Sequence, residues 1–243
     1  MLKPKSAMLL AAGLGRRMMP LTQDRPKALV QVHGTPLFDW ALERLERFGI
    51  GRIAVNLHSF APLLEAHVMR RWKGELHLSH EEKLLDTGGG IRACLPFLDA
   101  DPFFAINADT IWLDGAVPAL ERMTRAFDPE RMDALLLCAP VSAAIGYSGS
   151  GDFLMAADGR LQRRPEREQA PFVFASVQLL HPRLFENTPE GAFSMNLLFT
   201  RAIEAGRLFG IRHEAEWFEV GTKAAVEQAE LVLDDLGFRK QAA

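Results

Sequence analysis

The order of apolar and amphipathic segments constrains the fold of this 243-residue chain more than any other feature of its sequence. Short apolar, strand-like segments alternate with segments whose apolar residues recur at helical spacing. This alternation is typical of a parallel sheet that helices cover on both faces. We therefore predict a doubly wound α/β fold with a mostly parallel, Rossmann-like sheet. The predicted strands are residues 7–11, 52–57, 76–79, 102–107 and 133–139, and the predicted helices are residues 36–48, 62–72 and 90–98.

The pattern changes after Pro140. Three short strand-like segments follow a glycine- and serine-rich stretch, and tight turns between short strands predict a small antiparallel insertion. Two helices are expected to complete the chain, the second capped by Thr222 and ended by Gly237. The predicted strands here are residues 152–155, 160–163 and 172–180, and the predicted helices are residues 194–205 and 222–236. We expect residues 1–243 to form one domain.

The balance of charges excludes several classes of partner. A net charge of −3 and a pI near 6.2 give no long-range attraction to nucleic acid or to an anionic membrane, so we expect neither as a partner. The first apolar segment is too short for a signal sequence or a membrane span. Cys94 and Cys138 lie in apolar surroundings and are expected to be core residues of a cytoplasmic protein. The sequence does not reveal the oligomeric state.

A glycine loop follows the first predicted strand. Gly13 and Gly15 allow close approach of the backbone and can point N–H groups at phosphate oxygens, while Arg17 and Lys27 supply positive charge. The two common phosphate motifs are absent, because Met18 stands where a dinucleotide fingerprint has its third glycine and no G-K-[ST] closes the turn. We interpret the loop as a polyphosphate site, although a G-x-G pair alone fits an ordinary tight turn equally well.

Polar residues also end the fourth predicted strand. The carboxyl ends of parallel strands meet at one edge of a sheet, so Asn107 and Asp109 are expected to lie near the glycine loop. There Asp109 either binds a divalent cation or simply caps the next turn. Mg²⁺ that serves phosphates takes one or two protein carboxylates, so a second carboxylate from elsewhere in the chain is expected beside Asp109. We therefore expect Mg²⁺ as a cofactor.

The segment from Asp86 to Gly90 contains three consecutive glycines before the third predicted helix. Its backbone would allow a base edge or a ribose to approach closely and bind main-chain groups. The alternative is that these glycines only form a tight turn.

Together these motifs resemble those of the sugar-1-phosphate nucleotidyltransferases, which join a nucleoside triphosphate to a sugar phosphate and release pyrophosphate. The resemblance runs from about Ser6 to Leu236, and residues 84–91 and 107–109 are most similar to the N-acetylmuramate-1-phosphate uridylyltransferases. It implies UTP and N-acetylmuramate 1-phosphate as substrates, with a sugar-binding portion at about residues 140–220. Guanylyl transfer to mannose 1-phosphate is the alternative within this class. A nucleotide-sugar binding module without turnover is the alternative outside it.

The resemblance also implies roles for single residues. Glu219 stands where the family usually has an aspartate ligand, and Arg164 stands where it has the lysine of an E-K-P motif that meets the sugar phosphate. Asn107 and Ser176 are expected to contact the sugar, and family sequences often have glycine near Ser176. The residues implied to be catalytic are Arg17, Lys27 and Asp109. The residues implied to bind the nucleotide are Ala11, Ala12, Gly13, Gly15, Arg16, Arg17, Lys27, Thr87 and Gly88.

Overall fold

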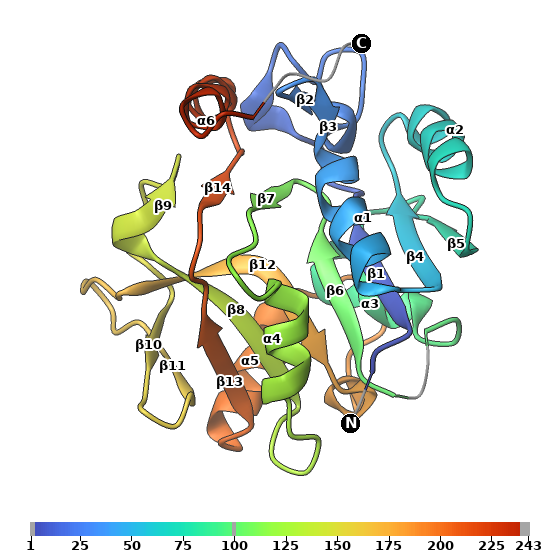
Figure 1. Ribbon diagram of the computed structural model, residues 1–243. Helices are drawn as coiled ribbons and strands as arrows, with labels where there is room; N and C mark the ends of the chain where they lie inside the picture. Colours follow the sequence, from blue (N-terminus) through green and yellow to red (C-terminus); the bar gives the residue numbers. More distant parts are fainter. Residues whose placement is uncertain (1–2, 99–100, 239–243) are drawn as a thin grey trace.

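The computed structural model describes residues 3–98 and 101–238 (Figure 1). The largest sheet of the described residues has nine strands, and four parallel strands form one half of it in the order β5-β4-β1-β6. Each lies within one residue of a predicted strand. In β1, β4 and β6 a mostly apolar run leaves little choice for a strand buried on both faces, whereas the edge strand β5 alternates polar and apolar residues. Their bounds are β1 Ser6–Leu10, β4 Arg52–Leu57, β5 Glu75–His80 and β6 Phe103–Asn107.

The other half of the sheet is organised around the long strand β12 (Phe172–Leu180). It pairs antiparallel with β6 on one side and with β8 (Ala134–Pro140) on the other, and β13 (Leu208–Arg212) runs parallel to β8. The hairpin of β10 (Phe153–Met155) and β11 (Leu161–Arg163) joins the start of β12. The predicted antiparallel strands are therefore confirmed, and they extend the main sheet.

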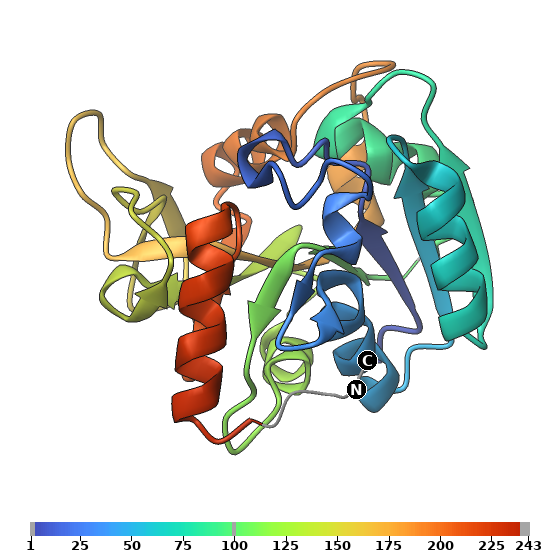
Figure 2. The ribbon, with the colours of Figure 1, turned by 90° about the horizontal axis from the view of Figure 1, so that it is seen from above.

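Helices cover both faces of the sheet, as the doubly wound prediction requires (Figure 2). One buried core lies under α1 (Leu37–Phe48), α2 (Ala61–Arg71) and α4 (Ala119–Ala126). The opposite core lies under α3 (Asp86–Cys94) and α5 (Met195–Glu204). Cys94 and Cys138 are free thiols in this second core, as predicted, and burial raises the pKa of Cys94 to about 11.

Helix α3 corrects the prediction of a helix at residues 90–98. It begins at Asp86 and therefore includes all three glycines, and it ends at Cys94, before Pro96. The N–H groups of Gly88 and Gly89 donate to the carbonyl of Phe193 at 2.9 and 3.0 Å. A Cβ at Gly88 would lie 2.4 Å from a ring carbon of Phe193. Close packing of α3 against the segment at Phe193 thus outweighs the low helix propensity of glycine.

A third core lies beside the carboxyl edge of the main sheet, under α6 (Lys223–Asp235). Thr222 caps this helix as predicted, since its hydroxyl accepts a hydrogen bond from the N–H of Ala225. The sequence did not reveal the short strands that α6 covers. They are β2 Gln31–Val32 and β3 Thr35–Pro36 in one hairpin, and β7 Thr110–Trp112, β14 Trp217–Glu219 and β9 Ala144–Ile145 in a separate sheet. Within the described residues, every helix is too short or too polar to cross a membrane.

Candidate functional site

Two adjoining cavities lie at the carboxyl ends of β1 and β6, the edge that the sequence indicated. The first, called the loop cavity, has a volume of about 460 Å³, and its lining includes Ala11, Ala12, Gly13, Glu81 and Thr87. The second, called the acidic cavity, has a volume of about 300 Å³, and its lining includes Arg17, Tyr147, Asp152, Ser176 and Glu219. Lys27, Asn107 and Asp109 line both. Two ligands bound in these cavities would therefore meet at these three side chains.

The glycine loop passes over the loop cavity in an open conformation. A Cβ at Gly13 would touch nothing within 4 Å, so this residue leaves room for a ligand. Gly15 has a φ of +62°, and its carbonyl accepts a hydrogen bond from the hydroxyl of Thr22 at 3.0 Å. This left-handed conformation favours glycine. Gly15 and the exposed Arg16 line neither cavity.

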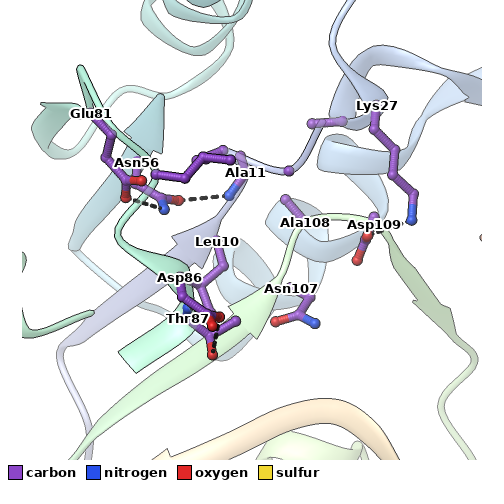
Figure 3. Close-up of a pocket in the computed structure, with 14 residues that line it drawn as sticks. Leu10, Ala11, Lys27, Asn56, Glu81, Asp86, Thr87, Asn107, Ala108 and Asp109 are labelled. Carbon is purple, nitrogen blue, oxygen red and sulfur yellow. Dashed lines mark hydrogen bonds and ion pairs between the residues drawn. The ribbon is translucent and has the colours of Figure 1, made fainter. Parts of the chain in front are cut away.

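A buried polar pair supports the glycine loop, and sequence reasoning missed it (Figure 3). The Asn56 Oδ1 accepts a hydrogen bond from the N–H of Ala11 at 2.7 Å, and the Asn56 Nδ2 donates to Glu81 Oε1 at 2.7 Å. The second Glu81 oxygen accepts from the N–H of Leu85 at 2.9 Å. Asn56 is a polar residue within an apolar strand and Glu81 follows the next one, which is the signal that could have revealed them.

The structure brings Lys27 and Asp109 together directly. The Lys27 Nζ lies 2.6 Å from Asp109 Oδ2, with side chains 13% and 33% exposed (Figure 3). Asp109 lies in the turn between β6 and β7, and Glu219 of β14 pairs with Thr110 of β7. The two carboxylates therefore come from the turn before β7 and from the strand that pairs with β7, and they line the same cavity.

Arg17 lies close to the backbone that follows Glu219. A Cβ at Gly221 would lie 3.3 Å from the Arg17 Nη2, so a larger residue there would crowd the guanidinium. Arg17 lines only the acidic cavity, whereas Lys27 lines both. Of the two cations, only Lys27 therefore borders the region that the cavities share.

Asn107 and Ser176 lie beside each other in the acidic cavity. The Asn107 Nδ2 donates to the Ser176 hydroxyl at 3.2 Å. Ser176 has a φ of +62° and lies where the pairing of β12 with β8 shifts register. This conformation explains why the resembled family often has glycine near this position.

Besides Gly15 and Arg16, two more predicted site residues, Gly88 and Arg164, line neither cavity. The N–H of Gly88 already donates to Phe193, so it is not free for a base. Arg164 turns away from the site, where its Nε donates to the carbonyl of Gly151 and its Nη1 to that of Glu168. By contrast, Thr87 does line the loop cavity.

Comparison with known proteins shows the family to which the chain belongs. Residues 7–186 match the model of the MobA-like NTP transferase domain family. The chain is 41% identical to the N-acetylmuramate alpha-1-phosphate uridylyltransferase of Caulobacter vibrioides, over 93% of this chain and 96% of that one. It is 29% identical to the enzyme of that name from Neisseria meningitidis serogroup B, over 92% and 96%.

A solved structure shares the fold. HddC from Yersinia pseudotuberculosis, complexed with GMP-PN, superimposes with a TM-score of 0.76 at 22% identity, over 94% of this chain and 99% of that one. This similarity extends the comparison to the whole sheet, including the strands after residue 186 that the family model does not reach. The chain therefore belongs to the MobA-like NTP transferase family, among the sugar nucleotidyltransferases.

Proposed function

We propose that this protein is a cytoplasmic, magnesium-dependent uridylyltransferase of cell-wall sugar recycling. It joins UTP to N-acetylmuramate α-1-phosphate, forming UDP-N-acetylmuramate and pyrophosphate. The observation that carries the proposal is the junction of two cavities at Lys27, Asn107 and Asp109, which suits a reaction between two bound phosphates. The 41% identity to the Caulobacter enzyme supports the choice of both substrates.

UTP would occupy the loop cavity. Gly13 leaves its backbone accessible to phosphate oxygens, and Lys27 supplies a charge at the shared wall. An ionised Glu81 only accepts hydrogen bonds, and each of its oxygens keeps a lone pair beyond the bonds to Asn56 and Leu85. It can therefore accept a hydrogen bond from a base that presents a ring N–H, as uracil and guanine do and cytosine does not.

The carboxylates fit a magnesium site. Asp109, in the turn before β7, and Glu219, on the strand that pairs with β7, line one cavity. The described residues contain no group of three or more acidic, histidine or cysteine side chains suited to a metal. Two protein carboxylates match Mg²⁺, which leaves its other positions to phosphates and water. Bound there, Mg²⁺ would neutralise charge on the transferred phosphoryl group. Glu219 in place of the family's aspartate keeps the charge and adds one methylene.

The side chains of this protein would position the reactants and stabilise charge. A phosphate oxygen of the sugar 1-phosphate attacks the α-phosphorus of UTP in line, and the bond to the β-phosphate oxygen breaks with release of pyrophosphate. The attacking phosphate is already ionised at neutral pH, so the site needs no general base. Lys27, on the wall that both cavities share, stabilises the charge that develops on the leaving pyrophosphate, and Arg17 adds positive charge from the acidic cavity.

A grid of substrates tests this proposal. UTP, GTP, CTP and dTTP are each combined with the 1-phosphates of N-acetylmuramate, N-acetylglucosamine, glucose and mannose, and pyrophosphate release is measured. We expect UTP with N-acetylmuramate 1-phosphate to be best, with kcat/KM for UTP at least about tenfold above GTP, or roughly 1.4 kcal/mol. An optimum at GTP with mannose 1-phosphate would overturn the substrates. No pyrophosphate from any pair would overturn the reaction.

A further inference from the structure

The acidic cavity contains two polar side chains that the proposed reaction does not use. Tyr147 and Asp152 line it together with Ser176 and Glu219, and they belong to the turn-rich segment between β9 and β10. Both side chains are partly buried. The chain has one tyrosine, so a phenolic hydroxyl occurs at no other place in this protein.

Asp152 is held rigidly at the edge of β12. Its N–H donates to the carbonyl of Phe172 at 2.7 Å, and its own carbonyl accepts from the N–H of Arg164 at 2.9 Å. Its Oδ2 accepts a hydrogen bond from the N–H of Phe174 at 2.9 Å, two residues before Ser176. Among the described residues this is the only hydrogen bond to the carboxylate, which leaves Oδ1 as an acceptor for a ligand.

Tyr147 is held in a complementary way. Its hydroxyl oxygen accepts a hydrogen bond from the N–H of Gly151 at 3.0 Å, so its own proton remains available as a donor. Its ring packs against Trp217 with centroids 6.2 Å apart. Burial, reinforced by the charges of Asp152 and Glu219, raises the pKa of Tyr147, so the hydroxyl keeps its proton at neutral pH.

The turn between the two side chains has little freedom. Gly151 has a φ of +78°, and a Cβ there would lie 2.2 Å from the carbonyl oxygen of Ala170. The Arg164 Nε donates to the carbonyl of Gly151 at 3.0 Å, directly beside Asp152. Arg164 therefore braces this turn from outside the cavity. A donor and an acceptor that are fixed before binding give specificity at low entropic cost.

We propose that Tyr147 and Asp152 form a donor–acceptor pair that recognises the substituents of the acceptor sugar. The inference rests on the proposed function. Tyr147 donates to an oxygen of the acyl or lactyl substituent, and Asp152 accepts from a sugar hydroxyl or the acetamido N–H. The carboxylate of Asp152 would repel a lactyl carboxylate, which places that substituent on the side of Tyr147.

Two conservative variants test the pair. Asp152→Asn keeps an oxygen for the N–H of Phe174 and changes the free oxygen into an amide donor. Tyr147→Phe keeps the ring on Trp217 and removes the hydroxyl. Asp158→Asn is the matched control, because Asp158 lies in the exposed turn between β10 and β11 and lines neither site cavity. Calorimetry measures binding of each sugar 1-phosphate, and steady-state kinetics measure KM for both substrates.

We expect each site variant to raise the dissociation constant and the KM of N-acetylmuramate 1-phosphate about tenfold or more. The KM of UTP should stay within about twofold of the wild-type value. The preference over glucose 1-phosphate should shrink by a similar factor, and the control should be unchanged. Unchanged acceptor binding in both variants would overturn the pair. An equal loss of affinity for every substrate, together with a lower thermal midpoint, would also overturn the pair. Absence of pyrophosphate release by the wild type would refute the proposed reaction separately, because calorimetry tests the pair without turnover.

Discussion

Removal of the Asn56 side chain should destabilise the protein strongly, because this residue is buried and its amide group bonds two separate segments. Asn56 is 3% exposed, and its amide group joins the first residue after β1 to the carboxylate that follows β5. Asn56→Ala would leave two buried groups without these partners, the N–H of Ala11 and one oxygen of Glu81. Both bonds measure 2.7 Å, so each is a full hydrogen bond.

The expected magnitude follows from these two groups. A buried N–H left without a partner costs about 1–3 kcal/mol, and a lost hydrogen bond to a charged group costs about 1.5–3 kcal/mol. Together they predict a loss of roughly 3–5 kcal/mol, a large part of the roughly 5–15 kcal/mol of a typical domain. Asn56→Asp would keep the acceptor for Ala11 but place a second carboxylate beside Glu81. Its destabilisation should therefore be largest at neutral pH and decrease as pH falls and one carboxylate is protonated.

Urea unfolding followed by circular dichroism measures these changes. An equal slope of the free energy of unfolding against urea concentration shows that variant and wild type expose the same surface on unfolding. Asn196→Ala is the matched control, because Asn196 is exposed and its side-chain oxygen accepts a hydrogen bond from Arg163 at the surface. It should change the free energy of unfolding by no more than about 0.5 kcal/mol. A change that small for Asn56→Ala as well would refute the reasoning.

Three further predictions concern other parts of the molecule. Asp109→Asn should lower kcat/KM by at least about a hundredfold at an unchanged thermal midpoint, and near-normal activity at limiting magnesium would contradict the metal assignment. Gly88→Ala should destabilise by about 1–3 kcal/mol in urea, since the added Cβ would lie 2.4 Å from a neighbouring phenylalanine ring, whereas Gly115→Ala meets nothing within 4 Å and serves as control. Burial lowers the pKa of His213, so its neutral form stabilises the fold above about pH 6.5, and this contribution is lost as pH falls toward the folded-state pKa. The loss of stability between pH 7.5 and 5.5 should therefore be smaller for His213→Gln than for wild type; equal losses would exclude this role.

The strands of the parallel half could be predicted because their signal is local. An apolar run such as residues 52–57 has few alternatives to a buried strand, and the observed β4 has these same bounds. The glycine loop and Asp109 could be placed at one edge for a topological reason, since carboxyl ends of parallel strands coincide. The roles of these residues, and the assignment of the whole chain to one domain, stay predictions.

The sequence could not decide between alternatives where a local pattern had two physical uses. Consecutive glycines suit a ligand-binding turn or close packing of a helix, and only the position of Phe193 shows that packing applies here. Arg164 lies in a sequence similar to a substrate-binding motif, yet its guanidinium braces the turn at Gly151. A sequence pattern gives the type of a side chain but not the direction in which it points.

By itself the sequence therefore determined the fold class and the edge of the sheet at which the glycine loop and Asp109 lie, while the phosphate-binding chemistry of the loop stays a prediction. These depend on short-range periodicity and on rules of strand direction that hold in any chain. The tertiary structure alone decided that Glu219 lies beside the turn of Asp109, that Asn56 and Glu81 support the glycine loop, and that Tyr147 and Asp152 face the second cavity. Each of these arrangements depends on how distant segments pack, and no local pattern encodes the direction of a side chain across such a contact.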